Sequence, residues 1–247
     1  MHPSADYSEP PAWAGGDVVG DYFDPVSGRL FVVARPSARP ELWAAYIEGA
    51  WLSYRQHGVE SAVDYDLVRD GKSTSLFFAA VEPGGRVVGG GRVQGPYTHV
   101  EQASAVREWA GREGTQELRR QIAARLDDGV IEIKAVWVDR DAVRHGELTA
   151  ALARMFVHSL KLMGVRYAFC TAASHAVRRW ESSGGVVSAD VAAVAYPDER
   201  YETLLMWWDR QNVFGLIAGE QVPALLAESG QFFLQPTVTP ACAPWVA

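Results

Sequence analysis

Residues 130–173 read VIEIKAVWVD, then RDAVRHGELTAALARMFVHSLKLMG, then VRYAFCTAA, and this stretch decides the fold. The first piece has the two-residue period of a β-strand, which places Ile131, Ile133 and Ala135 on one face and Glu132, Lys134 and Val136 on the other. The second piece has apolar residues at helical spacing, with Gly164 at the expected C-terminal end. The third is a short apolar strand. Strand, helix and strand within about forty residues form a βαβ unit, so two parallel neighbouring strands are expected.

The turn that opens this helix is a candidate anion site. The first backbone N–H groups of a helix have no partner within the helix, and the helix dipole adds positive potential at the same end. A phosphorylated ligand is therefore expected there.

Composition narrows the class of protein. The chain has 247 residues, of which 48% are hydrophobic and 21% charged, which favours one globular domain with an appendage. No apolar run approaches the length of a membrane span, and the N-terminus lacks the pattern of a signal peptide. Cys170 in an apolar strand and Cys242 in a Pro-rich tail predict no disulfide and a cytoplasmic location. The net charge of −7 argues against a nucleic-acid partner.

The remaining chain is predicted to form an α/β fold, a mixed sheet with helices on both faces. Residues 1–28, rich in Pro, Gly, Ser and Asp, are predicted to be a flexible arm, residues 29–209 one domain, and residues 210–247 a helical appendage and tail. Within the domain we expect strands at 29–34, 75–81, 86–95, 191–196 and 202–208, helices at 40–58, 103–126 and 175–183, and a loop at 59–72.

This order of elements resembles the GNAT acyltransferase superfamily over residues 29–209. In that family the two strands of the βαβ unit part, and the thioester of an acyl-CoA or an acyl-carrier protein lies in the gap. The resemblance implies that backbone N–H groups near Val136, Trp137 and Val138 polarise the thioester carbonyl. It also implies a phosphate loop made by Arg144, His145, Gly146 and Thr149.

The sequence departs from the family at three positions. Glu147 and Thr149 stand where the phosphate loop usually has small residues, and Trp180 replaces a Tyr that commonly protonates the leaving thiolate. A carboxylate at the phosphate loop weakens the case for ordinary acetyl-CoA binding.

A narrower resemblance concerns GGGRVQGPY (89–97) and IEIKAVWV (131–138). These strands are similar to those of acyl-homoserine-lactone synthases and N-acyl amino acid synthases, which use long acyl groups commonly delivered by acyl carrier protein. The resemblance implies Glu132 as the general base that takes the amine proton. It implies an acceptor site made by Arg55, Asp66 or Asp70, Arg92 and Lys134, with the acceptor carboxylate on Arg and its ammonium on Asp.

Each of these residues also has a structural interpretation. Glu132 can pair with Lys134 or Arg92 on one face of the sheet, and an acidic residue in the 59–72 loop can be a solvated surface charge. The histidines have no metal-ligand spacing, so no metal is expected.

The sequence thus predicts an enzyme, an N-acyltransferase that moves a medium or long acyl group from acyl-CoA or acyl carrier protein to a small amino-acid-like amine. Two alternatives remain. One is an acetyl-CoA-dependent N-acetyltransferase of small molecules, in which Arg144 would be essential. The other is a catalytically inactive GNAT-like module that binds a ligand or a partner protein. A homodimer interface on the C-terminal appendage is compatible with all three.

Overall fold

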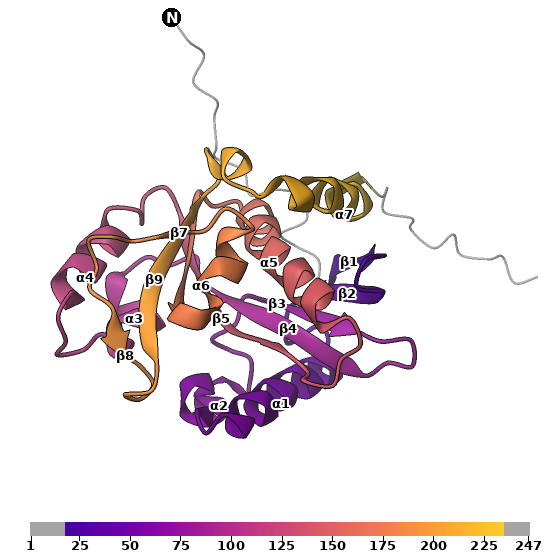
Figure 1. The fold of residues 1–247 in the computed structure, drawn as a ribbon, viewed down its shortest axis with the longest axis horizontal. Helices are drawn as coiled ribbons and strands as arrows, with labels where there is room; N and C mark the ends of the chain where they lie inside the picture. The colour runs from indigo at the N-terminus through magenta and orange to yellow at the C-terminus, as the bar shows by residue number, and fades with distance from the viewer. Residues whose placement is uncertain (1–17, 235–247) are drawn as a thin grey trace, which may run out of the picture.

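The computed structural model describes residues 18–234, and within them it shows a nine-stranded mixed sheet with helices on both faces (Figure 1). The predicted α/β fold is confirmed. The order along the sheet is β1-β2-β3-β4-β5-β6-β9-β7, with β8 paired to β9. The strands are β1 (Val18–Asp24), β2 (Arg29–Ala34), β3 (Leu76–Val81), β4 (Val87–Gln94), β5 (Val130–Val138), β6 (Tyr167–Ala173), β7 (Val186–Val187), β8 (Val194–Ala195) and β9 (Glu202–Asp209).

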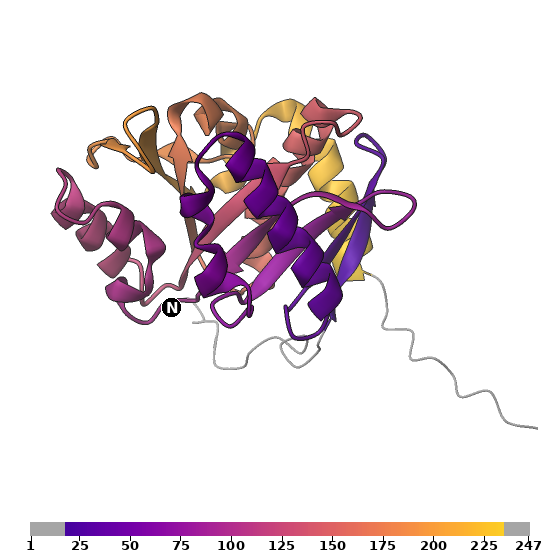
Figure 2. The same cartoon turned by 90° about the horizontal axis from the view of Figure 1, so that it is seen from below.

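The helices divide between the two faces. The α-helices are α1 (Pro40–Gln56), α2 (Tyr65–Val68), α3 (Ser104–Glu108), α4 (Thr115–Ala123), α5 (His145–Leu162), α6 (Ser174–Glu181) and α7 (Val222–Leu234). Short 3₁₀ turns are η2 (Glu60–Val63), η3 (Val100–Gln102), η4 (Val213–Gly215) and η5 (Gly219–Gln221). Figure 2 shows α1 lying across one face, with α3 and α4 towards one end of the molecule, while α5, α6 and α7 lie on the other face. None of the helices within residues 18–234 is long and apolar enough to cross a membrane.

The βαβ unit forms as predicted, and its strands then separate. β5 and β6 pair in parallel, with α5 as the crossover, but the pairing covers only the positions from Val130 to Glu132 of β5. β5 continues to Val138 alongside β4, whereas β6 continues alongside β9. The sheet therefore has a gap between two parallel strands, because each strand follows its antiparallel neighbour.

A β-bulge at Ala135 changes which way the side chains of β5 point. Ala135 has a φ of 50°, and the register between β4 and β5 shifts at this point. The predicted alternation is correct up to Lys134 and wrong from Ala135 onward: Ile133 and Val136 both contact the core under α5, and Ala135 packs under α1. A bulge adds one residue to one strand, so the residues after it exchange faces. Tyr46 of α1 holds the bulge by donating a hydrogen bond of 2.9 Å to the Ala135 carbonyl.

Two glycines of β4 allow α1 and α5 to approach the sheet closely. A Cβ on Gly90 would lie 2.2 Å from the Phe78 carbonyl oxygen and 2.7 Å from a ring atom of Tyr46 in α1. A Cβ on Gly91 would lie 2.6 Å from Cε of Met155 in α5. The GGG run therefore serves helix packing on both faces of β4.

The Gly90→Ala variant is expected to lower the free energy of unfolding by about 1–3 kcal/mol, because the methyl group overpacks a site closed by backbone. Urea denaturation measures the change. Gly230→Ala in α7 is the matched control, since a Cβ there meets nothing within 4 Å, and alanine is the better helix former. Equal stability of the wild type and Gly90→Ala would contradict the packing argument.

The predicted flexible arm, residues 1–28, is too long: Val18–Asp24 form the edge strand β1. Residues 1–17 lie outside the described part of the chain, as does the predicted tail with Cys242. The strand is recruited by tertiary contacts, since Tyr22 stacks on Phe31 of β2 with ring centroids 5.0 Å apart. The Gln231 side chain of α7 occupies the outer edge, accepting from the Phe23 N–H at 2.9 Å and donating to the Phe23 carbonyl at 3.0 Å. A strand of this kind cannot be predicted from amino-acid composition alone.

Three other elements differ from the prediction. The single helix expected at 103–126 is two helices, α3 and α4, because Gly111 and Gly114 between them adopt φ values of 73° and 81°. The 59–72 loop contains the short turns η2 and α2. The strand expected at 191–196 contracts to β8, and β7 is added beside β9.

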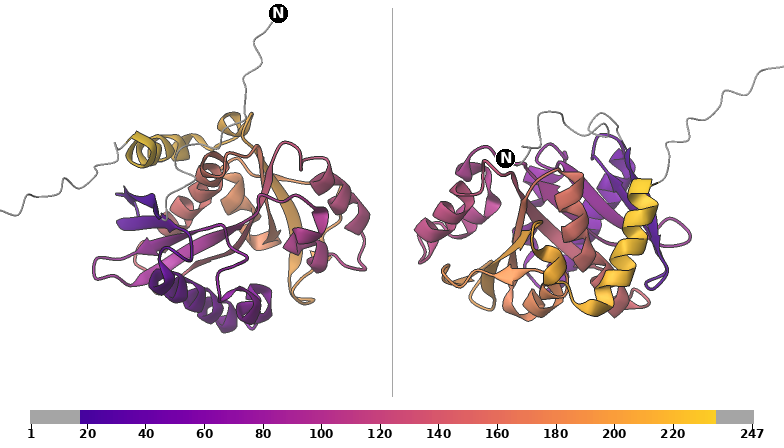
Figure 3. Two further views of the ribbon diagram at one scale, coloured as in Figure 1. Left: turned by 180° about the vertical axis from the view of Figure 1, so that it is seen from behind. Right: turned by 90° about the horizontal axis from the view of Figure 1, so that it is seen from above.

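Helix α7 packs on β1 and α5, as Figure 3 shows (yellow), through a buried ionic network. Glu228 of α7 contacts Arg154 of α5 at 2.6 Å and His158 of α5 at 2.9 Å, and Arg154 also faces Asp24 of β1 at 3.3 Å. All four side chains are at most 5% exposed. This network fastens α7 to the side of α5 away from α6, so α7 does not cover the gap between β5 and β6.

Candidate active site

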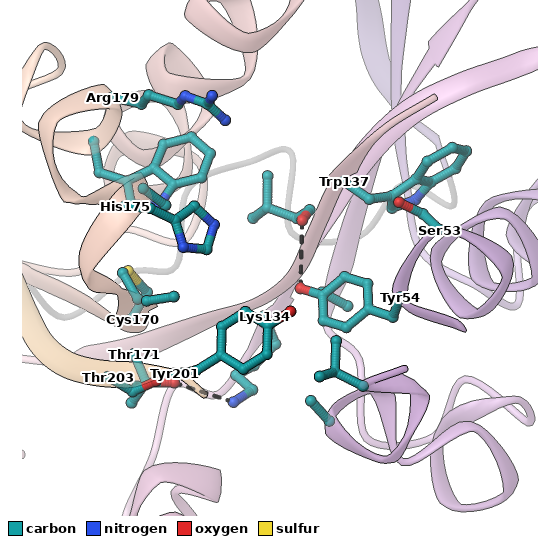
Figure 4. Close-up of a pocket in the computed structure, with 18 of the residues that line it drawn as sticks. Ser53, Tyr54, Lys134, Trp137, Cys170, Thr171, His175, Arg179, Tyr201 and Thr203 are labelled. Atoms are coloured by element: carbon teal, nitrogen blue, oxygen red, sulfur yellow. Dashed lines mark hydrogen bonds between the residues drawn. The ribbon is translucent and has the colours of Figure 1, made fainter. Parts of the chain in front are cut away.

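The gap between β5 and β6 opens into a cavity of about 380 Å³. Its walls come from α1, η2 and the residue before it, the bulged end of β5, α5, β6, α6, and the segment from β8 into β9. Segments that are more than a hundred residues apart in sequence therefore meet at this cavity, as Figure 4 shows for Tyr54 and Tyr201.

The cavity has an apolar half and a polar half, on opposite faces of the sheet. Val136, Phe156 and Trp180 line the first half and pack with the core under α5. Tyr54 and Tyr196 line the second half and pack against the cores under α1 and under α3 and α4. An extended ligand can therefore pass through the sheet with one end in each environment.

Lys134 is the buried cation of the polar half. Its Nζ forms an ion pair with Glu108 of α3, donates to Thr171 Oγ1 at 3.4 Å, and lies 3.9 Å from Glu132. Burial alone would lower the pKa of Lys134, but the carboxylates of Glu108 and Glu132 outweigh burial and raise the pKa well above its ordinary value. An ammonium has three donors and this one makes two hydrogen bonds to the described residues, so one donor is left for a ligand.

Tyrosines border the backbone of the bulge. Tyr54 donates a hydrogen bond of 3.4 Å to the Val136 carbonyl, drawn as a dashed line in Figure 4. Burial raises the pKa of Tyr54, and burial together with Glu108 raises the pKa of Tyr196 to about 12, so both phenols are protonated at neutral pH. The Tyr54 hydroxyl uses its one proton on the Val136 carbonyl, whereas the Tyr196 hydroxyl can donate to a ligand in the polar half.

Glu132 lies behind the cavity wall rather than in it. It is fully buried, and it accepts hydrogen bonds from the Tyr97 hydroxyl at 2.7 Å and from the N–H groups of Ser104 and Ala105 at 2.7 and 3.1 Å. The structure does not bring this carboxylate into contact with the cavity, and the geometry favours the structural interpretation, pairing with Lys134.

The predicted phosphate loop is only partly at the cavity. His145 and Thr149 line it, whereas Arg144 and Gly146 do not. The Arg144 guanidinium turns towards the β1–β2 hairpin, where it donates to the carbonyls of Val26 at 2.9 Å and Pro25 at 3.5 Å.

The predicted acceptor-binding residues are scattered. Arg55 is exposed and lies over the Trp51 ring at 5.0 Å, and Asp66 is exposed on α2. Asp70 pairs with Lys72 at 2.9 Å beside a second hollow, at the start of α1. Arg92 is 2% exposed and donates to Thr74 Oγ1 at 3.3 Å. Of the predicted site residues, the cavity brings together Lys134, Val136, Trp137, Val138, His145 and Thr149.

Sequence reasoning missed the residues that tertiary structure adds from other elements. These are Ser53, Tyr54 and His57 of α1, Thr171 and Cys170 of β6, His175 and Arg179 of α6, and Tyr196 and Tyr201 near β8. Tyr54 has the helical spacing of a core residue, four positions after Ala50, and the others carry no local motif. Burial raises the pKa of the Cys170 thiol, so Cys170 is not a thiolate nucleophile.

Two solved structures share this fold. One is FeeM, an N-acyl amino acid synthase from uncultured soil microbes, with a TM-score of 0.54 and 13% identity over 78% of this chain and 97% of FeeM. The other is the acyl-homoserine-lactone synthase LasI, with a TM-score of 0.52 and 13% identity over 77% of this chain and 98% of LasI. These likenesses show that the chain has the GNAT-like fold of such synthases, as its sequence predicted.

At the level of sequence, no family model matches the chain. Its relatives include the "Uncharacterized protein Rv1356c" of Mycobacterium tuberculosis and the "Uncharacterized protein Mb1391c" of Mycobacterium bovis. Each is 46% identical over 198 residues, which is 80% of this chain and 75% of the relative. The chain belongs to the same family as these mycobacterial proteins.

Proposed function

We propose that the protein is an N-acyltransferase, which moves an acyl group from a phosphopantetheine thioester to the amine of a small acceptor that carries a carboxylate. The observation that carries the proposal is the cavity between β5 and β6, with an apolar half on one face of the sheet and a polar half on the other. The shared fold with FeeM and LasI supports the same reaction class.

The apolar half is proposed to hold the donor. Val136, Val138, Phe156 and Trp180 provide a surface suited to the pantetheine arm and to a medium or long acyl chain. The same arm is present in acyl-CoA and in acyl carrier protein, and either can deliver it.

The polar half is proposed to hold the acceptor. The described residues that line the cavity include no Asp or Glu, whereas Lys134 offers a free donor on a cation. A carboxylate is the acceptor group that matches this donor best. An amino acid or a close analogue fits, with its amine facing the gap.

Backbone groups of β5 are proposed to polarise the thioester carbonyl. Beyond Glu132 the strand is no longer paired with β6, so N–H groups on that edge face the gap. As the amine attacks, the C–N bond forms and the C–S bond breaks. The thiolate then leaves without being protonated by a tyrosine, because the thiolate of a thiol with an ordinary pKa of about 8.5 is an acceptable leaving group.

His57 is proposed to accept the amine proton, in place of Glu132. It lines the cavity at the end of α1, close in sequence to Tyr54. An imidazole is well suited to general base catalysis near neutral pH. Glu132, buried and fully hydrogen-bonded, would instead hold α3 and keep Lys134 charged.

Mass spectrometry of lipid extracts from bacteria that overexpress the protein tests the proposal. The wild type is expected to produce a new N-acylated amine whose mass identifies both substrates, and His57→Gln is expected to lose at least about tenfold of it, since general base catalysis contributes about 10²–10⁴-fold. Purified protein with a panel of acyl-CoA and acyl-carrier-protein donors, acetyl-CoA included, identifies the carrier and the acyl length. Thioester binding without turnover for every donor would favour a ligand-binding module.

A further inference from the structure

The proposed donor carries a phosphate at the end of its pantetheine arm, and the structure offers two places for it. One is the turn before α5, where related folds lead one to expect it. The other is α6, on the same side of the cavity. The charges of the two places decide between them, and the argument rests on the proposed function.

The turn before α5 is poorly suited to an anion. Its arginine, Arg144, already donates to the Val26 and Pro25 carbonyls and does not line the cavity. Three carboxylates lie on or near the turn, those of Asp139, Asp141 and Glu147, and Glu147 is exposed in the first turn of the helix. Of the three, only Asp139 forms an ion pair within residues 18–234, with Arg86. Since Arg140 and Arg144 on the turn balance Asp141 and Glu147, a phosphate at this place would meet no net positive charge.

Helix α6, by contrast, carries net positive charge, with Arg178 and Arg179 against Glu181. Arg179 and His175 both line the cavity and are exposed at its mouth, where Figure 4 shows them on the same side. They are four residues apart on one helix, so they share a face. Over residues 18–234, the Arg179 guanidinium makes no ion pair or side-chain hydrogen bond.

We infer that Arg179, with His175 beside it, binds the phosphate of the donor's phosphopantetheine, and that Arg144 instead fastens the turn before α5 to the β1–β2 hairpin. A guanidinium offers two parallel N–H donors that match two phosphate oxygens. Bound there, the arm enters the cavity past Trp180 and leads the thioester to the bulge of β5.

The test is calorimetric binding of two probes that differ by the phosphate alone, S-octanoyl-4′-phosphopantetheine and S-octanoylpantetheine. Wild type, Arg179→Gln, Arg144→Gln and Arg178→Gln are compared. Arg178→Gln is the matched control, since Arg178 neighbours Arg179 on the same exposed helix and does not line the cavity. Thermal unfolding of each variant reports whether it is folded.

Arg179→Gln is expected to weaken binding of the phosphorylated probe by about tenfold, in the range of one charge-assisted hydrogen bond. Binding of the unphosphorylated probe should change by less than about twofold, and so should both affinities of Arg178→Gln. An equal loss for both probes in Arg179→Gln, or a larger loss in Arg144→Gln than in Arg179→Gln, overturns the inference and leaves the proposed function standing. If the wild type binds neither probe, the proposed function fails, and the inference fails with it.

Discussion

Replacing Lys134 by methionine is expected to reduce formation of the N-acyl product by about a hundredfold or more. Lys134 is the buried cation of the polar half, and one of its three donors is free for the acceptor carboxylate. Truncating one partner of a buried charge pair costs about 2–5 kcal/mol, and each 1.4 kcal/mol is about tenfold in affinity. Product yield with one acyl donor and a mixture of amino acids, followed by mass spectrometry, measures the loss.

The same change leaves the carboxylates of Glu108 and Glu132 without their cation, which destabilises the fold. The double variant Lys134→Met with Glu108→Gln removes one of these charges and separates the two effects. The double variant should recover most of the stability lost in Lys134→Met but none of the activity. Lys134→Arg keeps the charge and should therefore retain part of the activity. Normal product formation by a folded Lys134→Met variant would remove Lys134 from the acceptor site.

Replacing Glu132 by alanine is expected to lower the free energy of unfolding by about 3–5 kcal/mol at pH 7. The carboxylate accepts three hydrogen bonds, two of them from the first N–H groups of α3, and faces Lys134. Removing it leaves buried donors unsatisfied and a buried ammonium with one partner fewer. Urea denaturation at equilibrium gives the change.

Glu132→Gln is the matched control, because an amide oxygen can still accept from α3, and a loss of about 1–2 kcal/mol is expected. Burial raises the pKa of the Glu132 carboxyl in the folded protein. The folded state therefore holds this proton more tightly than the unfolded state, and the wild type loses stability relative to Glu132→Gln as the pH rises through the folded pKa. The difference between the two proteins should narrow as the pH rises above about 4, near the ordinary pKa of a glutamate. A difference that widens with pH would mean that the ionised carboxylate is the form favoured by folding.

Local sequence determined those parts of the fold that depend on periodicity. The stripe of α5 through Leu148, Leu152 and Met155 is buried as its spacing predicted, and β5 and β6 form parallel strands around it. The β3–β4 hairpin is likewise visible in its turn residues. These elements can be predicted because each buries one face against the same sheet, so the pattern of apolar residues repeats within the element itself.

Features that depend on a residue far away in the sequence could not be predicted from local periodicity. The strand period of 130–138 gives no sign of the bulge at Ala135, which Tyr46 from α1 stabilises. Apolar residues at helical spacing continue through 103–126, although two glycines divide the segment. Val18–Asp24 look like an arm until Phe31 and α7 pack against them.

The candidate site likewise has features that follow from local sequence and features that depend on tertiary contacts. The sequence predicted the βαβ unit, and the gap within it was implied only by the family resemblance. Lys134 and the residues from Val136 to Val138 line the cavity at that gap. Three features of the site are visible only in the tertiary structure. Glu132 lies behind the cavity wall, and the Arg144 guanidinium contacts the β1–β2 hairpin. His57 and Arg179 line the cavity. The physical reason is that a segment's own pattern favours its secondary structure and its buried face, whereas a side chain's partner across a gap depends on how distant elements pack.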